Sequence, residues 1–365
     1  MLPPRAFAAE DVFEWEMDEI FRGWICVGHA SQVSSPGSYV AREIGTDSVV
    51  VIGGRESRPY AFLNVCRHRG ARIVEDAEGS VRRRLRCPYH AWSYDLDGSL
   101  QAAPHMDGVE DFDTSCWGLI PVRVATIGGL VLVDLSGEAP DPHEHVGELA
   151  THLERYRNAS LARAGHIEYG VDANWKGIAE NYSECLHCPG VHPELNALSD
   201  YMSGEQVEGA GAWCGGSMTL RDGTATMGHA DANGRPPIEG LAADDLRSVL
   251  YFVLFPNALV SLHPDYVMLH TLWPRAAGRT DVICEFFFEP ETMAADGFDP
   301  SDAMGFWDTV NRQDWHVCEL AQKGVQTRGY VPGRYSAEEV DVHAFDVMVA
   351  DRYRRALVEA EEMPA

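Results

Sequence analysis

The sequence contains almost no lysine: only two of its 365 residues, Lys176 and Lys323, are of this type. Arginine supplies nearly all of the positive charge, and the formal net charge is −27. Nucleic acid is therefore not an expected partner, because its phosphates would be repelled. Two interpretations of the acidic charge stay open: solubility or adaptation to salt, and a field that attracts a cationic substrate.

Long apolar runs are missing as well. No apolar stretch approaches the ~18 residues of a membrane-spanning helix, so no membrane partner is expected. The N-terminus lacks an apolar segment ahead of its acidic residues and does not resemble a signal peptide. Nine cysteines, an odd number, without an export signal indicate a reducing compartment. We therefore expect a cytoplasmic protein whose cysteines and histidines bind metal rather than form disulfides.

A dinucleotide-binding fingerprint is also absent. The glycines of 209–216 lack the strand–GxGxxG–helix context that such a site requires. The sequence has neither an internal repeat nor a low-complexity tract. What it does have is enough length, with 45% hydrophobic residues, for two domains with complete cores.

Hydrophobic patterns divide the chain into three parts. Apolar residues at helical spacing predict an N-terminal helix over Ala8–Phe21. Short strand-like runs separated by Gly and Asp-Gly turns predict a small antiparallel β domain. A stretch rich in Pro, Gly and acids, 136–145, resembles a linker. The expected parts are 1–23, with its helix packed on the third part, 24–135 and 136–365.

The third part mixes helical and strand-like segments. Apolar runs over 248–274 and 280–290 predict strands of a second sheet. Helices are expected over Val146–Ala162, Asp172–Cys188, Asp302–Lys323 and Val340–Glu361. The predicted fold class is α+β: an antiparallel β domain, then a domain in which helices surround an antiparallel sheet.

Two cysteine–histidine pairs form the first candidate metal site. Cys66-x-His68 and Cys87-x-x-His90 are separated by eighteen residues, and each pair follows a strand-like segment. Two thiolates and two imidazoles suit either tetrahedral zinc or a [2Fe–2S] cluster in which two histidines bind one iron. Zinc fingers usually pair Cys with Cys and His with His, whereas each loop here supplies one of each. The arrangement favours the cluster, with zinc as the alternative.

The second candidate site is the stretch NYSECLHCPGVHPE, residues 181–194. On a helix, Glu184 and His187 would share a face at i and i+3. His192 would lie about 140° further around, so the two histidines could not meet on a straight helix. Pro189 lies between them, and a kink there would let both reach one metal.

Two histidines and one carboxylate form the facial triad of non-haem iron(II) oxygenases, which leaves positions for O₂. The segment NRQDWHVCELAQKG offers Asp314 and Glu319 as the carboxylate. Cys185 and Cys188 lie beside imidazoles that are already assigned. We expect these two cysteines to pack as small apolar groups, with zinc binding as the alternative.

The remaining histidines have ordinary interpretations. His263 and His270 lie on an apolar strand-like segment, so we expect core positions, with substrate contact as the alternative. The others are expected on loops or at the surface: His105, His143, His145 and His166.

A family resemblance joins the two sites. The stretch CRHRGARIVEDAEG…RCPYHAWSYDLDGSL resembles the cluster-binding region of Rieske non-haem iron oxygenase α-subunits, and the resemblance extends from about Phe21 to Arg355. It implies that Cys66 and Cys87 hold one iron of a [2Fe–2S] cluster, and that His68 and His90 hold the other. It also implies a catalytic domain of the helix-grip or START-like type.

The family pairs an acid-x₂-His-x₄₋₅-His segment with a distant Asp ahead of Gln-x-Gly. This resemblance implies that His187, His192 and Asp314 hold a mononuclear Fe(II). It implies that Glu184 bridges His187 to a cluster histidine of a neighbouring subunit, although most members have Asp at that position. Glu180, one helical turn earlier, is the alternative for this role. It further implies a homotrimer or larger assembly, and electrons from NAD(P)H through a separate flavin and iron–sulfur reductase.

Three stretches look most like the family group that acts on quaternary ammonium compounds: NWKGIAENYSECLHCPGVHPEL, SLHPDYVMLHTLWP and NRQDWHVCELAQKGVQTRGYVPGRYS. This group includes glycine betaine, choline and carnitine monooxygenases. The resemblance implies O₂-dependent hydroxylation or N-demethylation of a small cationic substrate, a quaternary ammonium compound such as glycine betaine. The alternatives are an aromatic-ring hydroxylase or O-demethylase, a Rieske-type electron carrier, and a zinc-binding structural protein.

A quaternary ammonium group has no N–H donor, so aromatic faces and carboxylates are its natural partners. Each candidate aromatic residue also has an interpretation as ordinary core packing. The candidates for substrate binding are Tyr201, Trp213, Tyr251, Phe255, Tyr266 and Trp273.

Overall fold

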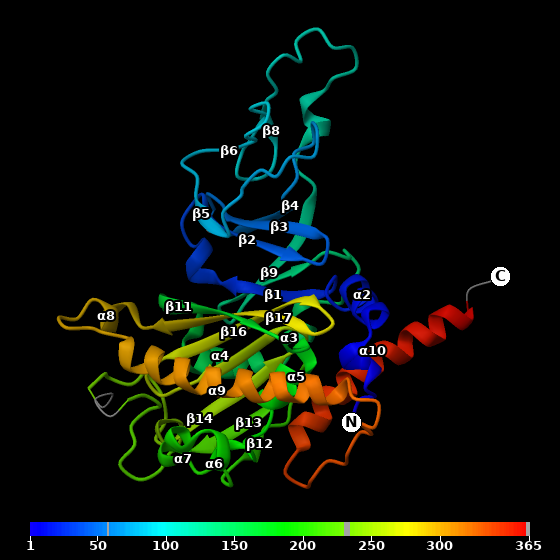
Figure 1. Cartoon of the computed structure of the whole chain (residues 1–365). Coiled ribbons are helices and arrows are strands. Elements are labelled where there is room, and N and C mark those ends of the chain that lie inside the picture. Colours follow the sequence, from blue (N-terminus) through cyan, green and yellow to red (C-terminus); the bar gives the residue numbers. More distant parts are fainter. Residues whose placement is uncertain (57, 230–233, 363–365) are drawn as a thin grey trace. The chain divides into compact units, whose positions relative to one another are not determined.

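The computed structural model describes residues 1–56, 58–229 and 234–362, which form two compact units (Figure 1). Phe21–Pro142 is the first, here called the inserted unit. Met1–Ile20 and His143–Ala365 together form the second, here called the main unit. The predicted β domain, 24–135, falls within the inserted unit. None of the helices in the described part of the chain is long and apolar enough to cross a membrane.

The inserted unit is built from antiparallel strands. A seven-stranded sheet has the order β1-β10-β9-β4-β3-β2-β5, and a three-stranded sheet has the order β6-β7-β8. Every residue of β10 is buried, which explains the apolar run of its first four residues. The strands are β1 (Trp24–His29), β2 (Ser38–Ile44), β3 (Asp47–Gly53), β4 (Pro59–Leu63), β5 (Glu78–Ser80), β6 (Leu85–Arg86), β7 (Ser93–Tyr94), β8 (Leu100–Ala102), β9 (Pro121–Ile127) and β10 (Leu130–Asp134).

The main unit contains a second antiparallel sheet of seven strands, in the order β11-β17-β16-β15-β14-β13-β12. All of β15 is buried, and so are the first eight residues of β16, so these central strands are covered on both faces. The strands are β11 (Ala162–Val171), β12 (Glu205–Gln206), β13 (Trp213–Thr219), β14 (Ser248–Leu254), β15 (Ala258–Leu262), β16 (Val267–Ala276) and β17 (Arg279–Phe288).

Helices pack on this sheet within the main unit. The long helix α9 lies beside α5 and β11, and α5 also contacts α10 and β16. The buried residues of α9 recur every three or four positions, as expected for a helix with one face on the core. The helices are α1 (Arg5–Ala8), α2 (Glu10–Glu19), α3 (Pro142–Val146), α4 (Leu149–Arg155), α5 (Trp175–Tyr182), α6 (Cys188–Val191), α7 (Pro193–Leu198), α8 (Pro290–Met293), α9 (Ser301–Val325) and α10 (Val340–Glu362).

Two helix predictions need correction. The expected helix Val146–Ala162 is the short helix α4 followed by a turn and the start of β11. Polar residues and two glycines make β11 look unlike a strand, but it is an edge strand whose pairing with β17 stabilises it. The expected helix Asp172–Cys188 begins after the cap Asn174 and already ends at Tyr182, as α5.

The N-terminal helix α2 is part of the main unit. The two carboxylate oxygens of Glu16 accept hydrogen bonds from Lys176 Nζ at 2.6 Å and from Trp175 Nε1 at 2.8 Å. The side chains of Glu16 and Lys176 are both fully buried. This buried ion pair links α2 to the first turn of α5, the helix that leads into the second candidate metal site.

Candidate metal centres and substrate cavity

Two loops of the inserted unit present the first candidate site. Cys66 and His68 follow β4, and Cys87 and His90 lie between β6 and β7. Both cysteines are buried, whereas His68 is exposed and His90 is partly exposed. The two imidazole rings lie 4.7 Å apart, centroid to centroid. The fold thus brings together a buried pair of thiols and an outer pair of imidazoles.

Each loop is closed by its own backbone hydrogen bonds. Cys66 N–H donates to Ala71 O, and Cys87 N–H donates to Trp92 O, both at 2.8 Å. The fourth residue after each cysteine has a positive φ, 72° at Gly70 and 62° at Ala91. This left-handed conformation turns each chain back, so that the imidazole of each pair faces the other loop.

Two aromatic residues support these loops, and the sequence prediction did not assign them a role. The indole of Trp92 stacks on His68 with centroids 4.9 Å apart and an interplanar angle of 5°. The Tyr94 hydroxyl lies 3.3 Å from Cys66 Sγ and accepts a hydrogen bond from Arg67 N–H at 3.1 Å. Burial raises the pKa of the Cys66 thiol, and the neighbouring Cys87 raises it further. A positive metal centre is the natural way to keep such thiols ionised, so this donor set fits a [2Fe–2S] cluster with mixed ligands.

The second candidate site lies where α5 ends. Glu184 follows the helix in irregular backbone, so Glu184 and His187 do not lie on a common helix as expected. His187 and His192 flank the single turn of α6, in which Pro189 occupies the first turn. Proline is accepted there because that position needs no backbone donor. The chain therefore breaks before His187, and Pro189 starts a new helix rather than kinking an old one.

This geometry brings both histidines to one carboxylate. Asp314 Oδ1, on α9, lies 2.8 Å from His192 Nε2 and 3.2 Å from His187 Nε2. The ligand atoms of the three residues all lie within 4.8 Å of one another. Two imidazole nitrogens and one carboxylate oxygen are the donors of a facial iron site, so the set fits a mononuclear Fe(II). Glu319, the other candidate acid, instead accepts a hydrogen bond from Asp172 N–H.

Each histidine is oriented through its other ring nitrogen. Glu184 Oε1 accepts from His187 Nδ1 at 2.5 Å, and Gln313 Oε1 accepts from His192 Nδ1 at 2.7 Å. Both Nε2 atoms are thereby left to face Asp314. Sequence reasoning gave no role to Gln313, although its position directly before Asp314 could have drawn attention to it.

Electrostatics at this site follow from two imidazoles held against two carboxylates. Burial acts to lower the pKa of His187, but hydrogen bonds to Asp314 and Glu184 outweigh it and raise that pKa to about 9. Burial acts to raise the pKa of Asp314, and the two imidazoles reverse this and lower it. A proton on the His187 imidazole offsets part of the negative charge of the two carboxylates, as a bound cation would.

The two cysteines of this segment do not pack as separate small groups. Cys185 and Cys188 are joined in a disulfide, with Cα atoms 5.1 Å apart. The expectation of free, packed thiols is therefore wrong for this pair. The turn between α5 and α6 brings residues three apart within bonding reach, which a kinked continuous helix would not have indicated.

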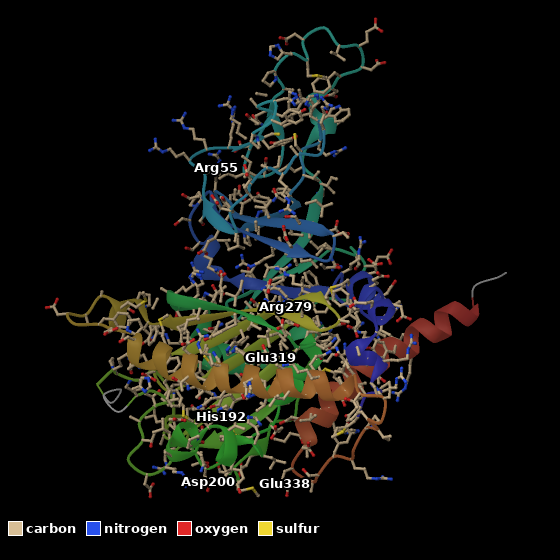
Figure 2. All side chains as sticks on the ribbon, viewed as in Figure 1. Arg55, His192, Asp200, Arg279, Glu319 and Glu338 are labelled. Carbon is tan, nitrogen blue, oxygen red and sulfur yellow. A yellow bond between two sulfur atoms is a disulfide. The ribbon has the colours of Figure 1, made fainter. Side chains whose placement is uncertain are left out.

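A cavity of about 330 Å³ opens beside the three ligand residues, all of which contribute to its lining. Figure 2 shows His192 at the end of the main unit that carries α6 and α7. Of the six aromatic residues proposed for substrate binding, Tyr201 and Tyr251 line this cavity. Tyr182 and Trp307, which were not proposed, line it as well.

The other four aromatic candidates are not among the described residues that line this cavity, because each packs elsewhere in the main unit. The indole nitrogens of Trp213 and Trp273 donate to Ala210 O and to Thr271 Oγ1. Phe255 packs against the rings of Trp175 and Phe345. Tyr266 stacks on His263 and donates its hydroxyl to Met227 O.

Comparisons with known proteins show which family the two domains belong to. Residues 23–113 match the Rieske [2Fe–2S] domain, and residues 158–355 match the ring hydroxylating alpha subunit (catalytic domain). The glycine betaine monooxygenase oxygenase subunit of Pseudomonas aeruginosa is 30% identical over 92% of this chain and 84% of its own length. The carnitine monooxygenase oxygenase subunit of Escherichia coli K12 is 30% identical over 90% of this chain and 85% of its own.

A solved structure agrees as well. The quaternary ammonium Rieske monooxygenase CntA, crystallised with an inhibitor, matches with a TM-score of 0.82 and 26% identity, covering 96% of this chain and 94% of that chain. The predicted α+β fold class and the predicted family resemblance are confirmed. The cofactors are a Rieske [2Fe–2S] cluster and a mononuclear iron that uses O₂. The enzyme acts on a small-molecule substrate with electrons from a separate reductase. The chain is an oxidoreductase and belongs to the family of Rieske non-haem iron oxygenase α-subunits.

Proposed function

We propose that the protein is the oxygenase component of a system that hydroxylates a quaternary ammonium compound such as glycine betaine. One observation carries the proposal: the two-histidine, one-carboxylate set opens into a cavity lined by aromatic rings and carboxylates. Two relatives are oxygenase subunits of glycine betaine and carnitine monooxygenases, and both of these substrates are quaternary ammonium compounds. Their similarity to this chain supports the same substrate class.

His187, His192 and Asp314 would hold the mononuclear iron, and Cys66, Cys87, His68 and His90 would hold the cluster. When bound, the iron supplies O₂ activation and the cluster supplies single electrons. The chain's own residues position and shield this chemistry. Glu184 and Gln313 fix the ring orientation of the two histidines by accepting hydrogen bonds from their Nδ1 atoms.

The cavity wall would hold the substrate by its charge. The rings of Tyr201, Tyr251 and Trp307 offer π faces to a trimethylammonium group, whose positive charge is spread over its methyl surface. Hydroxylation of an N-methyl group gives a product that releases formaldehyde and the demethylated amine. Hydroxylation of a chain carbon that is not bonded to nitrogen gives an alcohol, or an aldehyde hydrate where that carbon already carries a hydroxyl.

Glu184 has a second role in this proposal. Its carboxylate would bridge His187 to a cluster histidine of a neighbouring subunit in a homotrimer or larger assembly, and so carry electrons between subunits. The observed 2.5 Å contact between Glu184 Oε1 and His187 Nδ1 supports one half of that bridge. The oligomer and the location in the cytoplasm stay predictions.

An aromatic-ring hydroxylase or O-demethylase is the function that the cavity supports less well. An uncharged arene gains nothing from carboxylates, and desolvating them would weaken its binding. The testing experiment combines the oxygenase, a flavin and iron–sulfur reductase and NADH with a panel of betaines, trimethylammonium alcohols and arenes. Formaldehyde or a hydroxylated amine coupled to NADH use is the expected result. Turnover of arenes alone would refute the proposal.

A further inference from the structure

We infer that the preferred substrate is a quaternary ammonium monocation with a neutral, hydrogen-bonding tail and without a carboxylate. The inference rests on the proposed function and narrows it. Glycine betaine and carnitine are zwitterions, so a preference for a monocation separates this chain from the relatives named for those compounds.

The charges that line the cavity carry the inference. Five carboxylates belong to the lining: Glu184, Glu205, Asp314, Glu338 and Asp341. Within the described residues the lining contains neither lysine nor arginine. The residues that the structure does not describe, 57, 230–233 and 363–365, are also of other types. No basic side chain is therefore in place to pair with a substrate carboxylate.

A bound iron would not cancel the excess of negative charge in the cavity lining. Asp314 is a ligand in the proposed site, and Glu184 is bonded to the ligand His187. Their two negative charges match the double charge of Fe(II). Glu205, Glu338 and Asp341 remain, so the charge left for the substrate to compensate is negative.

These three acids come from two segments on the same cavity. Glu205 belongs to β12, and Glu338 and Asp341 lie where α10 begins. The segments are joined by a hydrogen bond of 3.3 Å from Gln206 Nε2 to Asp341 Oδ1. Figure 2 places Glu338, like His192, at the end of the main unit where α6 and α7 lie. Glu205 and Glu338 are exposed and Asp341 is half-buried, so the acids form the outer wall of the cavity.

A second observation points to the uncharged end of the ligand. Tyr251 lines the cavity, and its hydroxyl is buried behind the ring without a hydrogen-bond partner among the described residues. Burial raises the pKa of Tyr251, which keeps the phenol protonated and able to donate. A buried hydroxyl without a partner is costly, and a hydroxyl on the substrate would satisfy it. Ser217 and Gln206 offer further neutral donors and acceptors in the same lining.

The comparison that tests this uses substrates that differ mainly in the carboxylate. Choline and glycine betaine share a trimethylammonium group and a two-carbon frame, and L-carnitine can be compared with its methyl ester. With purified holoenzyme, reductase and NADH, kcat/KM is expected to be about tenfold or more higher for the monocation of each pair, because like charges in one cavity repel. Calorimetric titration of the holoenzyme with the same compounds should give the same order of affinity.

Two variants test whether the acids of the cavity wall cause the preference for a monocation. The double substitution Glu205→Gln and Glu338→Gln keeps size and polarity on an exposed wall and is expected to reduce the preference at least threefold, on the order of what loss of partly screened charges causes. Glu208→Gln is the matched control, since Glu208 lies on the same segment but outside the lining. It should leave the preference unchanged.

The possible results distinguish a failure of the monocation preference from a failure of the proposed function. Equal or higher kcat/KM for both zwitterions overturns this inference, while the proposed action on quaternary ammonium compounds stands. A monocation preference of unchanged size in the double variant also overturns it, because the acids would then not be its source. Turnover of arenes with no quaternary ammonium compound accepted removes the proposed function and the inference together.

Discussion

The side-chain oxygen of Gln313 accepts a hydrogen bond from His192 Nδ1 at 2.7 Å. Gln313 directly precedes Asp314, whose Oδ1 lies 2.8 Å from the opposite nitrogen of the same ring. Two consecutive residues of α9 therefore hold both ends of one imidazole. His192 is almost fully buried, so its ring orientation depends on these contacts rather than on solvent.

Gln313→Leu should weaken binding of the mononuclear iron by about 10- to 100-fold, since loss of an orienting partner typically has this effect. The Rieske absorbance should be unchanged. Gln313→Glu, which keeps an acceptor oxygen, should retain most of the affinity. Iron content after dialysis against graded chelator measures the effect, and full iron retention in the leucine variant would contradict the orienting role.

Cys66→Ser should abolish the cluster and all coupled turnover, because a serine oxygen cannot replace a buried thiolate in this ligand set. Visible absorbance and iron and sulfide analysis give the readout. Cys116→Ser is the control, since Cys116 is an exposed free cysteine of the same unit. A Cys66→Ser protein that keeps its Rieske spectrum would refute the assignment.

Asp314→Ala should lose the mononuclear iron and keep the cluster, because it removes the one carboxylate that both histidines face. Metal analysis should show iron falling to the amount held by the cluster alone. Glu319→Gln, on the same helix, should keep both metals. Full iron in the Asp314→Ala protein would mean that another carboxylate is the ligand.

Glu184→Gln should keep both metals and block electron transfer from cluster to iron. The amide oxygen can still accept from His187, but the negative charge that couples the two imidazoles is gone. Single-turnover reoxidation of the reduced cluster, followed by stopped-flow absorbance, is the measurement. Glu184→Asp should restore part of the rate. Reoxidation of Glu184→Gln at a near-normal rate would rule out the bridge.

The stability of the main unit should fall in mild acid because of His145. Burial lowers the pKa of His145 to about 4 from its usual 6.5, with Arg352 acting in the same direction. The folded pKa is the lower one, so the stabilising contribution is complete above pH 6.5 and is lost as the pH falls towards 4. The full shift corresponds to about 3 kcal/mol.

His145→Gln should flatten this dependence. Urea midpoints at pH 7.5 and pH 5.0, followed by tryptophan fluorescence, should differ less in the variant than in the wild type. His166→Gln, a change on strand β11, should leave the difference as it is. The prediction fails if wild type and His145→Gln respond to acid equally.

The sequence predicted the parts of the two sites that depend on local spacing. The Cys-x-His and Cys-x-x-His pairs lie on loops, as expected, because each pair directly follows a strand-like segment of the sequence. Helix α9 was predicted nearly to its ends, because its apolar residues recur at helical spacing over 25 residues. The strands β14 to β17 were predicted from their apolar runs, which are also a local property of the sequence.

What escaped prediction depends on contacts between distant segments. Gln313 acquires its role only when α9 meets His192, 121 positions away. The disulfide of Cys185 and Cys188 depends on a turn where a helix was expected. His145 was expected at the surface, but its Nε2 is buried by the packing of the main unit. Aromatic residues of core and cavity look alike in sequence, which is why only Tyr201 and Tyr251 of the six candidates line the cavity.

The buried pair of Glu16 and Lys176 also bears on how the chain folds. Its two members are 160 positions apart, and the whole inserted unit lies between them. During synthesis, Glu16 leaves the ribosome long before its partner and must wait, unpaired, while an independent β unit can already form. Closing so long a loop is a late event in folding. The chain loses conformational entropy on closure before the ion pair can contribute its stabilisation. Helix α5, and with it the approach to the iron ligands, is therefore expected to become native only after the inserted unit has folded.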